Sequence, residues 1–464
     1  MSVHGPLGAT QSGAFELRAP ALETGVSSSS RTRLGILGLS GLLITGLLIS
    51  ISAAGTDSLL PETVRPVPNW LAGPFGNTGL DLHVAGAIAV LGLMFGCYAI
   101  VVHTADRLPA RMVLTCIAAL YALVLLAPPL ISTDVFSYQA YGRMLALYGA
   151  NPYLQGPHVI LLDPLYPLIG AKWVATPTAY GPVFTALSYV FAPLSIAASV
   201  FAYKAIAAVA SLATVAVVWN TARLRGTNPV RSAALVGLNP LIVVYGVGGG
   251  HNDLLMLALL VAGVALVFQH RERAGASLMV LATGVKLTAG LFLPFALAGA
   301  GGRLARSRRR DILIGAAATA TVIAAVGFAA FGRGLLHLPA TVLHSQREGD
   351  WHSIPGFIGE RLGLGVFSHV VALMLAALFA GTFCWLLRRV WRGELDWIDG
   401  AGWATVVLLL TASSFLPWYV AWLLPLAALA TDRRLWRTAI VMTGVVQVIQ
   451  MLGYIPHSVS MPGL

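Results

Sequence analysis

The amino-acid sequence predicts an all-α polytopic membrane protein, a bundle of about 13 transmembrane or re-entrant helices. Three observations predict this class: 57% of the residues are apolar, only 10% are charged, and the mean hydropathy is +0.80. Soluble domains carry roughly 25% charged residues, so a soluble chain of this composition would expose large apolar patches. We therefore expect one membrane-embedded bundle, although the length of 464 residues alone would predict about three soluble domains.

Apolar runs recur along the chain, and a helix needs about 20 such residues to cross the hydrocarbon core. Nine runs have the full length, two are shorter, and one is interrupted by Thr283-Gly284-Val285-Lys286. The bundle is expected to occupy residues 34–454, between a disordered cytoplasmic tail at 1–33 and an external tail at 455–464. In order, the runs are 34–54, 82–102, 112–131, 200–221, 232–247, 253–269, 275–299, 311–331, 366–387, 398–414, 416–430 and 438–454.

The net charge of +11 is concentrated on one side of these runs. With the N-terminus in the cytoplasm, 21 of the 29 Lys and Arg residues fall in cytoplasmic loops and six in outer loops. The other two, Lys204 and Lys286, lie within apolar segments. Cytoplasmic loops of membrane proteins carry such an excess, so the charge indicates topology rather than a nucleic-acid-binding surface.

The same charge pattern predicts a hairpin over residues 275–299. The basic runs at 270–273 and 303–310 both belong in the cytoplasm, so the segment between them must cross an even number of times. We expect two short helices that turn near Lys286.

The cysteines and histidines predict no metal site and no disulfide. The three cysteines lie inside apolar runs without paired spacing, as small buried hydrophobic residues do. Three histidines fall in the outer loop 332–365, but their spacing matches no zinc pattern. One of them, His352, is expected to contact a sugar or a lipid head group instead.

The largest outer segment, residues 132–199, carries the first candidate site. A helix capped by a Ser-Thr pair should begin there and end at Gly149. At helical spacing, Asp134, Tyr138 and Tyr141 share one face of this extracytoplasmic amphipathic helix. The helix N-terminus favours a charged carboxylate, so Asp134 is expected to be able to accept a proton. The alternative is that Asp134 only complements the helix dipole and the tyrosines form an interface belt.

The second candidate is Gly248-Gly249-Gly250-His251-Asn252-Asp253, between two apolar runs. The glycines can allow close approach of a ligand. Three polar side chains at the boundary of a span are costly unless they are solvated or paired. This cost favours a functional role over the alternative, a polar turn with a capping Asp.

Two cations and an aromatic cluster complete the candidates. Lys286 is isolated in the apolar hairpin, where it is expected either to bind an anion or to snorkel. Lys204, near the outer end of its run, fits snorkelling better. Pro417-Trp418-Tyr419, with Trp422, is typical of an outer-leaflet aromatic belt, although such rings can also stack on sugars.

Seven short motifs follow one another in an informative order. They are Asp134-Val135-Phe136-Ser137-Tyr138, Asn151-Pro152-Tyr153, Thr176-Pro177-Thr178-Ala179-Tyr180-Gly181-Pro182, Asn239-Pro240, Gly249-Gly250-His251-Asn252-Asp253, Gly284-Val285-Lys286 and Pro417-Trp418-Tyr419. In this order they resemble the actinobacterial polyprenyl-phosphomannose-dependent α-1,6-mannosyltransferases of the MptB type. These enzymes belong to the GT-C superfamily of multi-pass glycosyltransferases. The resemblance runs from about residue 110 to about residue 455.

The resemblance implies an inverting transfer of mannose from a polyprenyl-phosphate donor to a mannan or lipoglycan acceptor, on the outer face of the cell membrane. It implies Asp134 as general base. Because a monophosphate leaving group does not require a metal in the way that a nucleotide diphosphate often does, we expect no obligatory metal, and no cofactor is expected. Many GT-C enzymes place this acid in the first outer loop, here 55–81, so Asp81 remains the alternative base. Lys286 and His251 are the candidates for the donor phosphate. The candidates for substrate binding are Tyr138, Tyr141, Asn151, Tyr153, Tyr180, Asn252, Asp253, His352, Trp418 and Tyr419.

Two other functions remain compatible with the sequence. A transporter or flippase of lipid-linked sugars would share the bundle and the buried lysine, but it should show inverted repeats. A GT-C transferase for another polyprenyl-phospho-sugar, such as phosphoarabinose, would differ only in pocket geometry.

Overall fold

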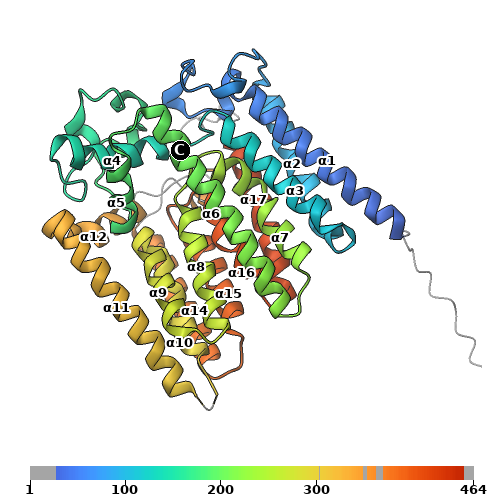
Figure 1. Cartoon of the computed structure of the whole chain (residues 1–464), viewed down its shortest axis with the longest axis vertical. Coiled ribbons are helices and arrows are strands. Elements are labelled where there is room, and N and C mark those ends of the chain that lie inside the picture. The colour runs from blue at the N-terminus through green and yellow to red at the C-terminus, as the bar shows by residue number, and fades with distance from the viewer. Residues whose placement is uncertain (1–27, 303, 348–352, 362–368, 454–464) are drawn as a thin grey trace, which may run out of the picture.

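The computed structural model describes residues 28–302, 304–347, 353–361 and 369–453. These residues form 17 α-helices joined by short 3₁₀ and π-helical turns, and no strand occurs among them (Figure 1). The all-α membrane class is confirmed. Residues 1–27 of the predicted tail at 1–33, the predicted tail at 455–464, and His352 lie outside the described residues.

Six helices among the described residues are long and apolar enough to cross a bilayer by themselves. They are α1 (Ser28–Ser52), α2 (His83–Thr104), α6 (Ile196–Leu224), α11 (Ala305–Phe331), α14 (His369–Trp391) and α17 (Arg433–Gly453). The first begins at Ser28, inside the tail expected to be disordered. Its serines continue the helix beyond the apolar run, because short polar residues are favoured at helix starts.

The other apolar runs form shorter or broken helices. A bent pair, α7 (Pro229–Gly237) and the π-helical turn Leu241–Val247, turns by 47°. The remaining ones are α3 (Ala110–Leu126), α8 (Asp253–Phe268), α9 (Glu272–Val285), the turn Leu287–Phe292 with α10 (Leu293–Gly299), α15 (Trp397–Thr411), and the turn Pro417–Trp422 with α16 (Leu424–Leu429). Every predicted run therefore corresponds to helical structure, but only six have the full length as one straight helix.

The basic turns at residues 222–228, 270–273, 304–310 and 391–396 gather at one end of the bundle. Arg225 pairs with Asp396 at 3.2 Å, which joins the end of α6 to the start of α15. Arg308 pairs with Glu272 at 2.6 Å and joins the starts of α9 and α11. The N-terminal part of α9 also packs with Ala300, just after α10. The segment between α9 and α11 thus returns to the end where it began, and the predicted hairpin is confirmed.

The opposite end carries the outer segment, with α4 (Asp134–Tyr148) and α5 (Pro182–Phe191), and also α12 (Leu338–Arg347), which α13 (Ile354–Arg361) follows in the chain (Figure 1). Figure 1 places α4, α5 and α12 together at this end. Gly149 ends α4 in the left-handed conformation, as predicted (φ 64°). The amphipathic character expected for α4 is not observed, because residues 134–142 are all buried. Helices α5 and α6 and the turn Pro157–Ile160 pack against it.

Candidate active site

A cavity of about 510 Å³ opens at the end of the bundle remote from the basic turns. Its polar wall includes Asp134 and Tyr141 of α4, Tyr180, and Lys286 at the hairpin tip. Its apolar wall comes from the hairpin and from α12, α14 and α15. The cavity is large enough for a sugar phosphate, and it joins a carboxylate and an ammonium group to an apolar surface.

Asp134 begins α4 in a segment that is held from several sides. Its N–H donates to Ser132 Oγ at 3.2 Å. Before it, Leu130 N–H donates to the Gly248 carbonyl at 3.1 Å. The ammonium of Lys204 donates to the Ala127 and Pro128 carbonyls. Lys204 is 1% exposed, so the snorkelling expected for it is wrong, and it fixes the chain that leads into Asp134.

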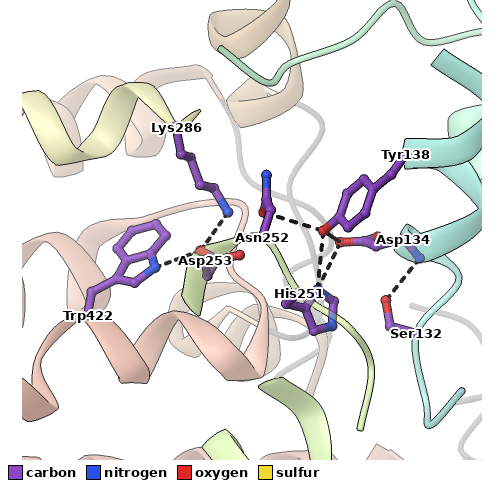
Figure 2. Close-up of polar contacts among 8 residues, drawn as sticks. All are labelled: Ser132, Asp134, Tyr138, His251, Asn252, Asp253, Lys286 and Trp422. Carbon is purple, nitrogen blue, oxygen red and sulfur yellow. Dashed lines mark hydrogen bonds and ion pairs between the residues drawn. The ribbon is translucent and has the colours of Figure 1, made fainter. Parts of the chain in front are cut away.

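Asp134 lies in a buried network with Tyr138, His251 and Asn252 (Figure 2). The Tyr138 hydroxyl is 3.5 Å from Asp134 Oδ2, 3.5 Å from His251 Nδ1 and 3.4 Å from Asn252 Oδ1. His251 Nδ1 is 3.4 Å from the same Asp134 oxygen. Catalytic hydrogen bonds are often this long before substrate binds. These contacts fix the position of Oδ2 of the Asp134 carboxylate.

His251 is enclosed rather than open to the cavity. Its side chain is 0% exposed, and its ring stacks on Trp418 with centroids 3.6 Å apart. A Cβ at Gly249 would lie 2.8 Å from His251 Nε2. This glycine therefore makes room for the imidazole, whereas the sequence predicted room for a ligand.

Lys286 is paired and faces the cavity. Its Nζ lies 2.8 Å from Asp253 Oδ1, and Trp422 Nε1 donates to the same oxygen at 2.7 Å (Figure 2). The ammonium also lies over the Tyr419 ring, 4.3 Å from its centroid. Trp418 and Trp422 are 6% and 4% exposed, so the interpretation of these rings as a membrane-surface belt is wrong. These two indoles are buried beside the site, where Trp418 packs on His251 and Trp422 donates to Asp253.

The tyrosines around Asp134 keep their phenolic protons. Burial raises the pKa of Tyr138 well above its ordinary value, and the negative charge of Asp134 raises it further. The pKa values of Tyr141 and Tyr180 are raised for the same two reasons, burial first. A phenol that keeps its proton can donate a hydrogen bond to a carboxylate, a carbonyl or a sugar hydroxyl.

Two predicted residues lie in supporting positions. Asn151 Nδ2 donates to the Phe331 carbonyl at 2.7 Å, which fixes the outer segment to the end of α11. Tyr153 Oη donates to the Tyr180 carbonyl at 3.0 Å. Neither residue lines the cavity.

The alternative base, Asp81, is also outside the cavity. Its side chain is 39% exposed and pairs with His83 at 2.7 Å. Among the described residues, no group of three or more His, Cys, Asp or Glu side chains is placed to hold a metal ion.

Sequence reasoning missed part of the cavity wall. Lys172 and Trp173, in the 3₁₀ turn Ala171–Trp173, line the cavity, and so do Phe379 of α14 and Leu408 of α15. No spacing in the sequence connects these residues to Asp134. The adjacent Lys-Trp pair in a loop without a long apolar run is the one local signal that could have marked the turn.

Comparison with known proteins gives two family matches and several relatives. Residues 33–301 match the N-terminal domain of the alpha-(1->6)-mannopyranosyltransferase family, and residues 352–455 match the MptB C-terminal domain. Alpha-(1->6)-mannopyranosyltransferase A of Mycobacterium tuberculosis is 32% identical over 340 residues, which cover 67% of this chain and 64% of that protein.

Two further relatives align over more of the chain. A probable alpha-(1->6)-mannopyranosyltransferase of Mycolicibacterium smegmatis is 28% identical over 89% of this chain and 81% of its own length. Alpha-(1->6)-mannopyranosyltransferase B of Corynebacterium glutamicum is 26% identical over 83% of this chain and 71% of its own length. The chain therefore spans slightly less than two thirds of the M. tuberculosis relative and more of these two.

Proposed function

The chain belongs to the alpha-(1->6)-mannopyranosyltransferase family, and from this membership we propose that it transfers mannose from a polyprenyl-phosphate donor to a mannan or lipoglycan acceptor. The linkage formed is α-1,6. One observation carries the proposal: a single cavity holds the carboxylate of Asp134 and the ammonium of Lys286. An inverting transfer from a sugar phosphate needs a base for the attacking hydroxyl and a cation for the departing phosphate.

Asp134 is the general base. It takes the proton of an acceptor hydroxyl, and the hydroxyl oxygen attacks the anomeric carbon of a β-mannosyl phosphate. The bond from that carbon to the phosphate oxygen breaks with its electron pair, so polyprenyl phosphate leaves and the new linkage is α. Tyr138 and His251 approach Oδ2 of Asp134, which leaves Oδ1 to receive the proton.

Lys286 binds the donor phosphate and stabilises its charge as the bond breaks. Asp253 and Tyr419 hold the ammonium at the cavity wall. His251 was also expected at the phosphate, but its enclosed ring supports a different role. It positions Asp134 and does not touch the donor.

The donor's hydrocarbon chain lies along the apolar wall. Leu291, Phe379 and Leu408 line the cavity there, and the most apolar part of α14 is almost entirely exposed. A chain leaving the cavity past α14 would therefore enter lipid directly. The basic turns at the other end of the bundle support an outer-face position for the cavity, because basic loops are retained in the cytoplasm.

The test is an assay of the purified protein in lipid nanodiscs with polyprenyl-phosphomannose and a short α-1,6-mannoside. We expect extension of the mannoside by one α-1,6-linked mannose and release of polyprenyl phosphate. Transfer from polyprenyl-phosphoarabinose alone would show another sugar specificity. Movement of a labelled lipid-linked sugar across vesicle membranes, with no transfer, would show a flippase.

A further inference from the structure

The cavity has two walls of different chemistry that belong to different surroundings. The apolar wall includes Phe379 of α14, a candidate membrane span that is mostly exposed, and Leu408 of α15. The facing wall is built by the outer segment, where Lys172 is exposed and Trp173 is half-buried. A lipid-linked molecule and a hydrophilic molecule would therefore approach along different walls.

The turn Ala171–Trp173 is fixed relative to Asp134. A Cβ at Gly170 would lie 2.5 Å from Thr133 Oγ1, so the turn packs directly against the residue before Asp134. On its other side, Tyr141 Oη donates to the Thr176 carbonyl at 3.0 Å. Contacts before and after the turn therefore hold it against α4 and the residue that precedes this helix.

The side chains at this turn suit a neutral sugar. An indole presents a flat apolar face that packs on the C–H face of a pyranose ring, with a polar N–H at its edge. The Lys172 ammonium lies over the Trp173 ring, 5.4 Å from its centroid. Its flexible four-carbon stem lets the ammonium move aside when a sugar stacks on the indole, and it can then donate to the hydroxyls of that sugar. Ligand sites commonly combine aromatic area with a few such polar groups.

We infer that Trp173 and Lys172 form the binding subsite for the terminal hexopyranose of the acceptor, and that stacking there brings one hydroxyl of this sugar to Asp134. The inference rests on the proposed function. The donor sugar is located differently, through its phosphate on Lys286 and its chain on the apolar wall. The acceptor arrives from water over the exposed turn.

The experiment compares Trp173→Ala and Trp173→Phe with the wild-type protein in nanodiscs. Trp173→Ala should raise the KM for an α-1,6-mannoside roughly fivefold, because stacking contributes on the order of 1 kcal/mol. Trp173→Phe, which keeps an aromatic face and most of the volume, should lie between the two. The KM for polyprenyl-phosphomannose should not change. Trp70→Ala is the matched control, since Trp70 is 52% exposed and does not line the cavity.

Direct binding of α-1,6-mannotriose, measured by saturation-transfer NMR, separates this inference from the proposed function. Weaker binding to both Trp173 variants supports the subsite whether or not the donor is turned over. Unchanged mannotriose binding, or a rise in the donor KM alone, overturns it. Failure of the wild-type protein to consume the donor overturns the proposed function instead.

Discussion

Asp134 carries the central prediction at the scale of single residues. Asp134→Asn preserves the shape of the side chain and removes its basicity, so turnover should fall about 10²–10⁴-fold. Expression should be normal, because Asn is also a favourable residue at a helix start. The measurement is initial rate of mannoside extension, with donor binding measured separately and expected to be near normal.

Asp81→Asn is the control for that substitution. The Asp81 carboxylate is exposed, pairs with His83 and lies away from the cavity, so its loss should leave most activity. Wild-type turnover in Asp134→Asn would remove Asp134 from the mechanism. Loss of activity in Asp81→Asn alone would move the reaction to the first outer loop.

Lys286 carries the prediction for the donor. Lys286→Ala removes a charge-assisted contact to the phosphate, which should weaken donor binding by roughly 1.5–3 kcal/mol. It also leaves Asp253 as an unpaired buried carboxylate, which destabilises the protein. The double variant Lys286→Met with Asp253→Asn removes both charges, so it should fold better and still show the raised donor KM. A normal donor KM in the double variant would contradict phosphate binding by Lys286.

The site residues that sequence predicted correctly as neighbours are those set by local rules. Asp134, Tyr138 and Tyr141 come together because helical spacing places them on one face. Lys204 was misinterpreted because its partners are backbone carbonyls, which sequence does not display. Trp173 was missed because only the folded path of the outer segment brings it to the cavity.

At the scale of elements, the hairpin tip depends on close contact with the start of α5. Gly181 N–H donates to the Val285 carbonyl at 3.0 Å, and a Cβ at Gly181 would lie 2.2 Å from the Gly284 carbonyl oxygen. Gly181→Ala should therefore displace the tip that carries Lys286 and cost about 1–3 kcal/mol through overpacking. The readouts are a lower thermal midpoint in scanning fluorimetry and a raised donor KM.

Gly96→Ala provides the matched control for that steric argument. Gly96 lies inside α2, and a Cβ there would meet nothing within 4 Å. Its replacement should be neutral or stabilising by up to about 1 kcal/mol, because Ala is the better helix former. Equal thermal midpoints for the two variants would contradict the close contact at the hairpin tip.

The elements also show which structure a sequence pattern can predict. Charges alone predicted the hairpin, because the topology rule acts on loops that remain in the cytoplasm. The burial of α4 could not be predicted in the same way. Two of its covering elements, α5 and the turn Pro157–Ile160, come from a loop whose course has no periodic signal.

At the scale of the whole molecule, orientation in the membrane is the prediction to test. Leu162, 96% exposed, lies in the outer segment, and Arg306 lies among the basic turns. With the exposed Cys384 replaced, Leu162→Cys should react with a membrane-impermeant maleimide in intact cells. Arg306→Cys should react only after permeabilisation. Labelling of position 306 from outside would show that the topology is the opposite one and that the cavity lies on the cytoplasmic face.

The ion pair between Lys286 and Asp253 bears on how readily the whole site empties after each reaction. A lysine without a carboxylate would have the phosphate of the spent lipid as its sole counter-ion, and departure of that lipid would leave a bare charge in an apolar cavity. Under the proposed phosphate binding by Lys286, Asp253, which lies 2.8 Å from the ammonium, would give it a partner as the phosphate leaves. We therefore expect the aspartate to compete with the product, to shorten its residence time and to favour repeated cycles over a dead-end complex.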